Sequence, residues 1–278
     1  VAVNPDTQLS VIARLNGWPI RRLDVSPGVA KVAGRELQEW IRPFNRPELV
    51  PNARFDFSGV ENIPKKGAAI LVFNHRSYFD PTAVALLTGQ AERPPRPLGN
   101  KVVFVAPIIG RLGALMGGIR VDRGAGSNEP LDKAVKALEG GEMVAMAPQG
   151  TIPRGPAFFE PVLKGRWGAA RLAHATKAPV IPVGLWGTEK IWPRSARLPS
   201  LDITDPPTIS VTVGGPVAMH YRSLEKDTER IMSAIVDLLP SEAREHRTPT
   251  EEELLLTFPP GYSGDPTAEA DRRPGSDT

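Results

Sequence analysis

The stretch NHRSYFDP, residues 74–81, joins a predicted strand to a predicted helix. The apolar run from Ala68 to Phe73 before it is typical of a short buried strand. Asp80 followed by Pro81 predicts a helix start, with an acidic N-cap and a proline at the first helical position. We therefore expect His75 at the carboxyl end of a strand, which is where open α/β sheets bind their ligands.

The spacing of His75 and Asp80 indicates a catalytic pair. A carboxylate five positions after a histidine can turn back and accept a hydrogen bond from its imidazole. That bond fixes the tautomer and stabilises the imidazolium that forms when the ring takes a proton. His75 would then be a general base oriented by Asp80. The alternative is that Asp80 only caps the helix and His75 only belongs to a loop.

The spacing His-x4-Asp after a strand resembles the first signature block of the glycerolphosphate acyltransferase superfamily, which includes the lysophosphatidic acid acyltransferases. Three further blocks follow in the order of that family. They are Lys101 with PIIG at 107–110 and GIRVDR at 118–123, then APQGTI at 147–152 with Lys164-Gly165 behind it, and VIPV at 180–183. The resemblance implies a mixed, largely parallel α/β sheet flanked by helices.

The same resemblance implies where the acceptor binds. Arg123 is the first choice for the acceptor phosphate, since a guanidinium can grip phosphate oxygens in a fork. The secondary phosphate contacts are Lys101, Arg154 and Lys164. The turn Gln149-Gly150-Thr151 is expected to contact the acceptor, with Gln149 at an acceptor hydroxyl.

Two residues of the third block depart from the family pattern. Gln149 stands where the family usually has glutamate, and Ile152 where it usually has arginine. The first change removes a negative charge. The second removes a phosphate contact, and two alternatives are open: Arg154 replaces that contact, or no residue does. The identity of the acceptor therefore stays open.

Composition narrows the chemistry. The chain of 278 residues has no cysteine, which excludes disulfides, thiolate metal sites and a cysteine nucleophile. Its 4 histidines lack a metal-ligand spacing, so we expect neither a metal nor a cofactor. It contains no Gly-x-Ser-x-Gly elbow, which argues against a serine hydrolase. A net charge of +3 and an arginine-rich middle favour anionic partners, namely coenzyme A, an acyl-carrier protein, a lysophospholipid or an anionic membrane surface. Nucleic acid is not expected.

Hydropathy predicts a protein that touches the membrane without crossing it. No apolar run approaches the roughly 18 residues of a spanning helix. Val1 to Ser10 is polar and lacks the charged start and apolar core of a secretory signal. We expect a cytoplasmic protein that is peripheral on the inner face of the cell membrane.

Four segments are expected along the chain. Residues 1–25 resemble the C-terminal end of a haloacid-dehalogenase-type phosphoserine phosphatase domain, but the chain lacks the Asp-x-Asp nucleophile of those enzymes. We interpret this segment as a remnant of a preceding domain, and the alternative is a simple N-terminal arm. Residues 26–58 are expected to form a helical arm and linker, whose helix at 28–43 packs on the domain or lies at a membrane interface. Residues 59–246 are the acyltransferase domain. Residues 247–278, rich in Pro, Glu, Gly and Asp, are predicted to be disordered.

Within the domain, strand and helix patterns alternate, as in a mixed α/β fold. We predict strands at 68–73, 119–121, 143–146, 180–184 and 209–213, and helices at 81–87, 130–138, 164–177 and 224–239.

These features together predict an acyltransferase that moves a fatty acyl group from acyl-coenzyme A or acyl-carrier protein to the free hydroxyl of lysophosphatidic acid, giving phosphatidic acid. The alternatives are an acyltransferase on glycerol 3-phosphate, another lysophospholipid or a glycolipid, and a non-catalytic lipid-binding module that keeps the fold.

Overall fold

The computed structural model describes residues 46–100, 118–121 and 129–267. The predicted phosphatase-like remnant and the helix at 28–43 lie outside the described residues. So do two of the predicted phosphate contacts, Lys101 and Arg123.

A seven-stranded sheet forms the centre of the domain, in the order β1-β7-β6-β2-β5-β3-β4. Its pairs are parallel except for the antiparallel pair of β6 and β7. This confirms the predicted mixed, largely parallel sheet. The strands are β1 (Arg54–Ser58), β2 (Ala69–Phe73), β3 (Arg96–Asn100), β4 (Ile119–Val121), β5 (Met143–Met146), β6 (Val180–Trp186) and β7 (Thr208–Val213).

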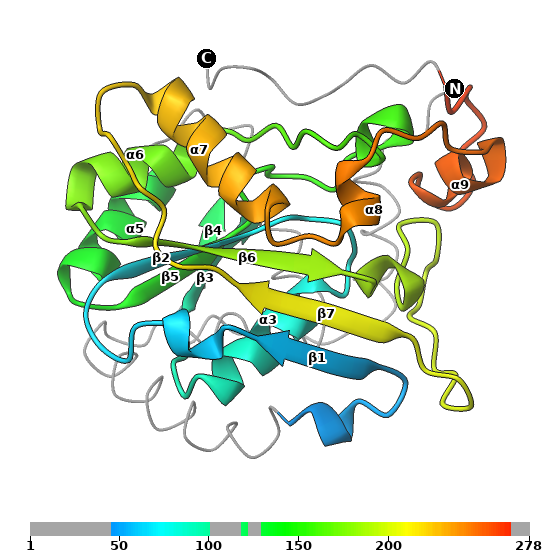
Figure 1. The fold of residues 1–278 in the computed structure, drawn as a ribbon, viewed down its shortest axis with the longest axis horizontal. Coiled ribbons are helices and arrows are strands. Elements are labelled where there is room, and N and C mark those ends of the chain that lie inside the picture. Colours follow the sequence, from blue (N-terminus) through cyan, green and yellow to red (C-terminus); the bar gives the residue numbers. More distant parts are fainter. Residues whose placement is uncertain (1–45, 101–117, 122–128, 268–278) are drawn as a thin grey trace, which may run out of the picture.

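Helices cover both faces of the sheet, with α5, α6 and α7 on one face and α3 on the other (Figure 1). The α-helices are α3 (Asp80–Gln90), α5 (Glu129–Glu139), α6 (Gly168–Thr176), α7 (Leu224–Val236), α8 (Ser241–Arg244) and α9 (Glu251–Leu256). Short 3₁₀ helices are η2 (Pro47–Leu49), η3 (Val60–Asn62), η5 (Gly155–Phe158) and η6 (Thr188–Lys190).

Strand β2 explains why the run before His75 is apolar throughout. Its side chains alternate between the two layers, because successive residues of a strand point to opposite faces. Leu71 and Phe73 pack in the cluster that includes α3, whereas Ile70 and Val72 pack in the cluster that includes α5, α6 and α7. All five residues of β2 are buried, so both faces require apolar side chains.

The alternating pattern predicted most of these elements, but several bounds differ and two strands were not predicted. The helix expected from residue 164 begins at Gly168. Strand β1 lies in the segment that we assigned to the linker, and its pairing with β7 shows that the sheet includes residues 54–58. Strand β3 was not predicted, because its sequence RPLGN contains both a proline and a glycine.

The prediction of disorder after residue 246 is wrong for residues 247–267. Thr250 and Glu253 form a capping box that begins helix α9. Leu254 and Phe258 are buried, and the Thr257 hydroxyl accepts a hydrogen bond from the Gly155 backbone N–H at 2.7 Å. A few apolar residues therefore fix a segment whose overall composition is typical of disorder.

None of the helices in the described ranges combines the length and the apolar character of a membrane span.

Candidate active site

His75 and Asp80 meet at the carboxyl end of β2, as the spacing predicted. The distance from His75 Nδ1 to Asp80 Oδ2 is 2.6 Å. The His75 side chain is 23% exposed, whereas the carboxylate of Asp80 is completely buried. Because a carboxylate accepts hydrogen bonds, Nδ1 carries the proton and Nε2 has the free lone pair of the neutral ring. The ring is thus arranged to take a proton at Nε2.

Asp80 organises the whole loop as well as the imidazole. Its Oδ2 accepts hydrogen bonds from the backbone N–H groups of Arg76 at 2.7 Å and Ser77 at 2.8 Å. Its Oδ1 accepts one from the hydroxyl of Thr188 at 2.6 Å. Asp80 is the first residue of α3 and Phe79 is its N-cap, so the predicted capping role is wrong. The carboxylate turns back to the loop of His75, where four donors compensate its burial.

Asn74 and Ser77 hold the two ends of this loop, and sequence patterns did not reveal either role. Asn74 exchanges two hydrogen bonds with the backbone of Leu185 in β6, at 2.9 and 2.7 Å. The Ser77 hydroxyl lies 3.0 Å from the carbonyl oxygen of Thr188 and 2.7 Å from that of Trp192. Both partners lie more than 100 residues away in the sequence, so local patterns carried no signal for them. Through these contacts β6 and η6 fix the backbone that carries His75.

Gln149 contacts the backbone of His75 in this structure. Its Oε1 accepts a hydrogen bond from the His75 N–H at 2.6 Å, and its side chain is 1% exposed. The sequence predicts a contact between Gln149 and an acceptor hydroxyl, whereas in this structure its Oε1 is bonded to the loop backbone. The turn of the third block follows at once, with Gly150 in the left-handed region at φ 69° and its N–H bonded to the Ala147 carbonyl at 2.9 Å.

The rest of the third block lies against the C-terminal segment. Ile152 is buried, and its carbonyl oxygen accepts a hydrogen bond from Arg194 Nη1 at 2.7 Å. Thr151 is half-buried, with its hydroxyl 3.4 Å from the Ile152 carbonyl. Arg154 is half-buried at the start of η5, and Lys164 is exposed between η5 and α6. Arg194 thus contacts the backbone of the residue that replaces the arginine of the family pattern.

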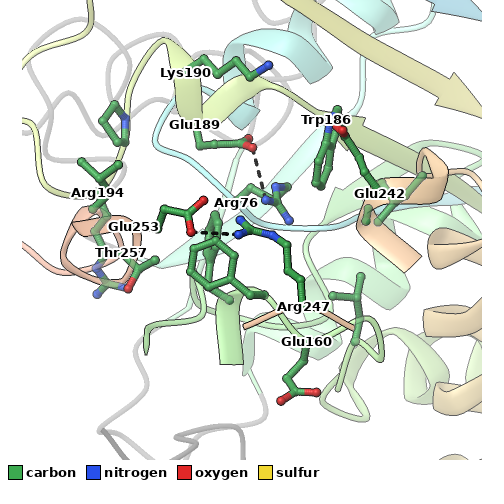
Figure 2. Close-up of a pocket in the computed structure, with 17 residues that line it drawn as sticks. Arg76, Glu160, Trp186, Glu189, Lys190, Arg194, Glu242, Arg247, Glu253 and Thr257 are labelled. Carbon is green, nitrogen blue, oxygen red and sulfur yellow. Dashed lines mark hydrogen bonds and ion pairs between the residues drawn. The ribbon is translucent and has the colours of Figure 1, made fainter. Parts of the chain in front are cut away.

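Arg76, beside His75 in the sequence, points into a cavity of about 500 Å³ (Figure 2). Its guanidinium lies between the rings of Phe158 and Trp186, 4.4 and 4.1 Å from their centroids, and forms an ion pair with Glu189 at 3.2 Å. Helix α9 supplies a second ion pair to the cavity wall, between Arg247 and Glu253 at 2.8 Å. The cavity wall therefore contains two ion pairs, and α9 forms part of it.

Among the described residues, no group of three or more His, Cys, Asp or Glu side chains is placed to hold a metal ion.

A model of the acyltransferase family matches residues 54–186, which span the sheet from β1 to β6. The match identifies residues 54–186 as an acyltransferase domain. The resemblance predicted from the four blocks is confirmed.

Relatives of the domain come from bacteria and plants. An uncharacterized protein of Mycobacterium tuberculosis (strain H37Rv) is 33% identical over 162 residues, covering 55% of this chain and 43% of the relative. A chloroplastic 1-acyl-sn-glycerol-3-phosphate acyltransferase of Brassica napus is 30% identical over 152 residues, covering 54% of this chain and 42% of the relative. The chain thus spans less than half the length of these curated relatives.

A solved structure has the same fold. The 1-acyl-sn-glycerophosphate acyltransferase PlsC from Thermotoga maritima superposes with a TM-score of 0.51 at 19% identity, covering 84% of this chain and 86% of that one. The superposition covers a larger share of the chain than residues 54–186.

Proposed function

We propose that this chain transfers a fatty acyl group from a thioester to the free hydroxyl of lysophosphatidic acid, giving phosphatidic acid. The observation that carries the proposal is the hydrogen bond between His75 Nδ1 and the buried Asp80 at the carboxyl edge of β2. This hydrogen bond fixes the tautomer of His75, so that Nε2 can accept a proton.

The reaction needs one base and no protein nucleophile, because a thioester is already activated. The acceptor hydroxyl oxygen forms a bond to the carbonyl carbon of the thioester while its proton passes to Nε2 of His75. The carbon–sulfur bond then breaks, and the departing sulfur takes the proton from the imidazolium. Asp80 stabilises that imidazolium and keeps the ring oriented. The products are the ester and the free thiol, so every atom of the two substrates is accounted for.

The donor is acyl-coenzyme A or an acyl-carrier protein, and no further cofactor is invoked. For the acceptor phosphate we propose Arg123 first, with Lys101, Arg154 and Lys164 as secondary contacts. Gly150 and Thr151 complete the acceptor loop through their backbone. Gln149 is assigned to positioning, since its bond to the His75 N–H supports the loop that carries the base.

Three alternatives keep the same chemistry with another acceptor, namely glycerol 3-phosphate, another lysophospholipid or a glycolipid. Gln149 and Ile152, where the family pattern has charged residues, motivate them. A non-catalytic lipid-binding module is disfavoured, because binding alone does not require a histidine–aspartate pair at the carboxyl end of β2 within the His-x4-Asp block. We further propose a cytoplasmic location, peripheral on the inner face of the cell membrane, because the proposed acceptor is a membrane lipid.

The test is release of free thiol from acyl-coenzyme A or acyl-carrier protein in the presence of each acceptor, with His75→Ala as the control. We expect release with lysophosphatidic acid and loss of release in the variant. Release that persists in His75→Ala would refute the mechanism. Release that requires a glycolipid would refute the acceptor while leaving the base in place.

A further inference from the structure

The connection between η6 and β7 exposes aliphatic side chains to an unusual degree. Leu198 is 76% exposed, Leu201 79% and Ile203 63%. Single exposed hydrophobic residues are common on protein surfaces, but three within one short segment require an explanation. We call residues 198–203 the apolar loop.

The apolar loop lies at the same edge of the sheet as His75. Strands β2 and β6 are parallel, so their carboxyl ends share an edge, and β7 runs back from that edge because it is antiparallel to β6. Figure 1 shows the connection projecting beyond the ends of β6 and β7, on the opposite side of β6 from α8 and α9. The loop and the end of β2 therefore lie at the same edge of the sheet.

Hydrogen bonds to the body of the domain fix the loop in this exposed position. The Ser200 N–H donates to the Ile191 carbonyl at 2.8 Å, and its carbonyl accepts from Asn52 Nδ2 at 2.6 Å. Asp202 accepts a hydrogen bond from the Thr204 N–H at 2.8 Å, which shapes the turn after Leu201. The aliphatic side chains on either side of Ser200 are thus presented by an anchored backbone.

Helix α9 exposes further aliphatic side chains next to the base of the connection, across β6 from the apolar loop. The Ser195 N–H donates to the Leu256 carbonyl at 3.2 Å, which joins the base of the connection to the end of α9. Leu255 and Leu256 are 41% and 53% exposed. Two chain segments that are far apart in the sequence therefore place leucines at one edge.

We propose that the apolar loop inserts into a lipid bilayer and holds the carboxyl edge of β2 against the membrane. Its aliphatic side chains are separated by Pro199-Ser200 and by Asp202, so they form separate projections rather than a continuous apolar surface. Such projections suit fluid acyl chains, which adapt to their shape, better than a rigid protein partner. The assignment rests on the proposed function in that a membrane lipid acceptor requires its enzyme at the bilayer surface.

The charges around the loop predict the kind of membrane binding. Arg197 lies directly before the apolar loop, and Asp202 lies within it. Asp205 forms an ion pair with Arg54 at 3.2 Å. These opposite charges nearly cancel, so attachment by this loop should depend on apolar insertion and only weakly on anionic lipid or on salt.

The experiment measures co-sedimentation of the chain with vesicles of phosphatidylcholine alone. We expect binding that changes less than twofold between low and high salt. The triple variant Leu198→Ser, Leu201→Ser, Ile203→Ser should bind at least about tenfold more weakly, since three aliphatic side chains leave the bilayer. Tyr221→Ser, an exposed large side chain elsewhere on the surface, should bind like the unmodified chain. Equal binding of the triple variant, or no binding of the unmodified chain, would refute the proposal.

The absence of cysteine from the chain allows a second readout. A Leu201→Cys variant carrying an environment-sensitive fluorophore should shift its emission to the blue when vesicles are added. Emission that is already blue-shifted before vesicles are added would refute the proposal. If that shift is independent of protein concentration, another part of the chain covers the loop; if it depends on protein concentration, a second copy of the chain covers it.

Activity separates this inference from the proposed function. On a short-chain acceptor dissolved as monomers, the triple variant should equal the unmodified chain, whereas on acceptor embedded in vesicles it should be at least about fivefold slower. Equal rates on the embedded acceptor would refute the docking role of the loop. If neither protein acylates any acceptor, the proposed function fails, and the vesicle measurements still decide the apolar loop.

Discussion

The domain contains two histidine–aspartate pairs that are nearly identical as isolated pairs. In the first, His75 Nδ1 lies 2.6 Å from Asp80. In the second, His174 Nε2 of α6 lies 2.7 Å from Asp227 of α7. Each histidine side chain is 23% exposed, and each aspartate is buried. Each aspartate also accepts two backbone N–H groups, which for Asp227 are those of His220 at 3.0 Å and Tyr221 at 2.7 Å.

The surroundings of the two pairs differ. The second pair joins two helices, and the His174 ring contacts the ring of Tyr221 edge-on at a centroid distance of 5.5 Å. The Lys177 ammonium lies 4.0 Å from the same Tyr221 ring. The first pair lies at the carboxyl edge of β2, where Gln149 and Thr188 support it. A short bond between histidine and aspartate is therefore not a sign of catalysis by itself, and the position of the pair in the fold is what distinguishes them.

The largest expected contrast between the pairs is in activity. His75→Ala should reduce thioester-dependent acyl transfer by roughly 10²–10⁴-fold, because it removes the proposed general base. His174→Ala should leave kcat within about twofold, since the second pair lies between α6 and α7. Steady-state thiol release measures both. Similar losses in the two variants would show that the pairs were assigned incorrectly.

The second pair should instead matter for stability. Asp227→Ala should lower the free energy of unfolding by about 2 kcal/mol, because it removes a buried carboxylate that accepts hydrogen bonds from the His174 ring and from the backbone N–H groups of His220 and Tyr221. Glu229→Ala, an exposed position on the same helix, is the matched control. Urea denaturation measures the difference. A loss no larger than that of the control would contradict the structural role.

The stabilisation by Asp227 should depend on pH. Burial opposes ionisation, but hydrogen bonds from the His220 N–H, the His174 ring and the Tyr221 N–H outweigh it and lower the pKa of the Asp227 carboxyl. A lowered pKa in the folded state contributes stability above the unfolded pKa of about 3.9, and this contribution is lost as pH falls through the folded value. The stability gap between the unmodified chain and Asp227→Ala should therefore narrow below about pH 4. A constant gap would refute this linkage.

The support beneath the first pair should have a smaller effect. Gln149→Leu removes the acceptor for the His75 N–H and should reduce kcat by roughly tenfold. Gln149→Glu keeps an acceptor oxygen and should stay within about threefold, with unchanged acceptor preference. A changed acceptor preference would instead support the predicted contact between Gln149 and an acceptor hydroxyl. Equal activity of Gln149→Leu and the unmodified chain would contradict positioning.

The ion pair on α9 should have the smallest effect. The hydrogen bond from Arg247, with that from the Thr250 backbone, lowers the pKa of Glu253 to about 2. Because this pKa is depressed, the pair supports α9 above the ordinary glutamate pKa of about 4.3 and loses that support as pH falls towards 2. Hydrogen exchange of residues 251–256 should speed up on acidification, and less so in Glu253→Gln. Exchange that does not depend on pH after correction for the intrinsic rate would show that Leu254 and Phe258 alone hold the helix.

The sequence predicted the features that depend on local order. Strand β2, the helix after it and the pairing of His75 with Asp80 all lie within one short segment, so periodicity and spacing suffice to find them. The partners of Asn74 and Ser77 are distant in the sequence and therefore had no local pattern. Helix α9 was missed because Pro, Glu, Gly and Asp dominate the whole segment after residue 246, although Leu254 within the helix and Phe258 just after it are buried.

The strand order has a consequence for synthesis on the ribosome. Strand β1 is made early, yet its hydrogen-bonded neighbour is β7, which emerges about 150 residues later. Until then the nascent chain carries Phe55 and Phe57, whose rings stack at a centroid distance of 5.6 Å in the finished domain, on a strand that still lacks this partner. Completion of the sheet must wait for residues 208–213, and chaperones that shield apolar nascent segments have that interval in which to act.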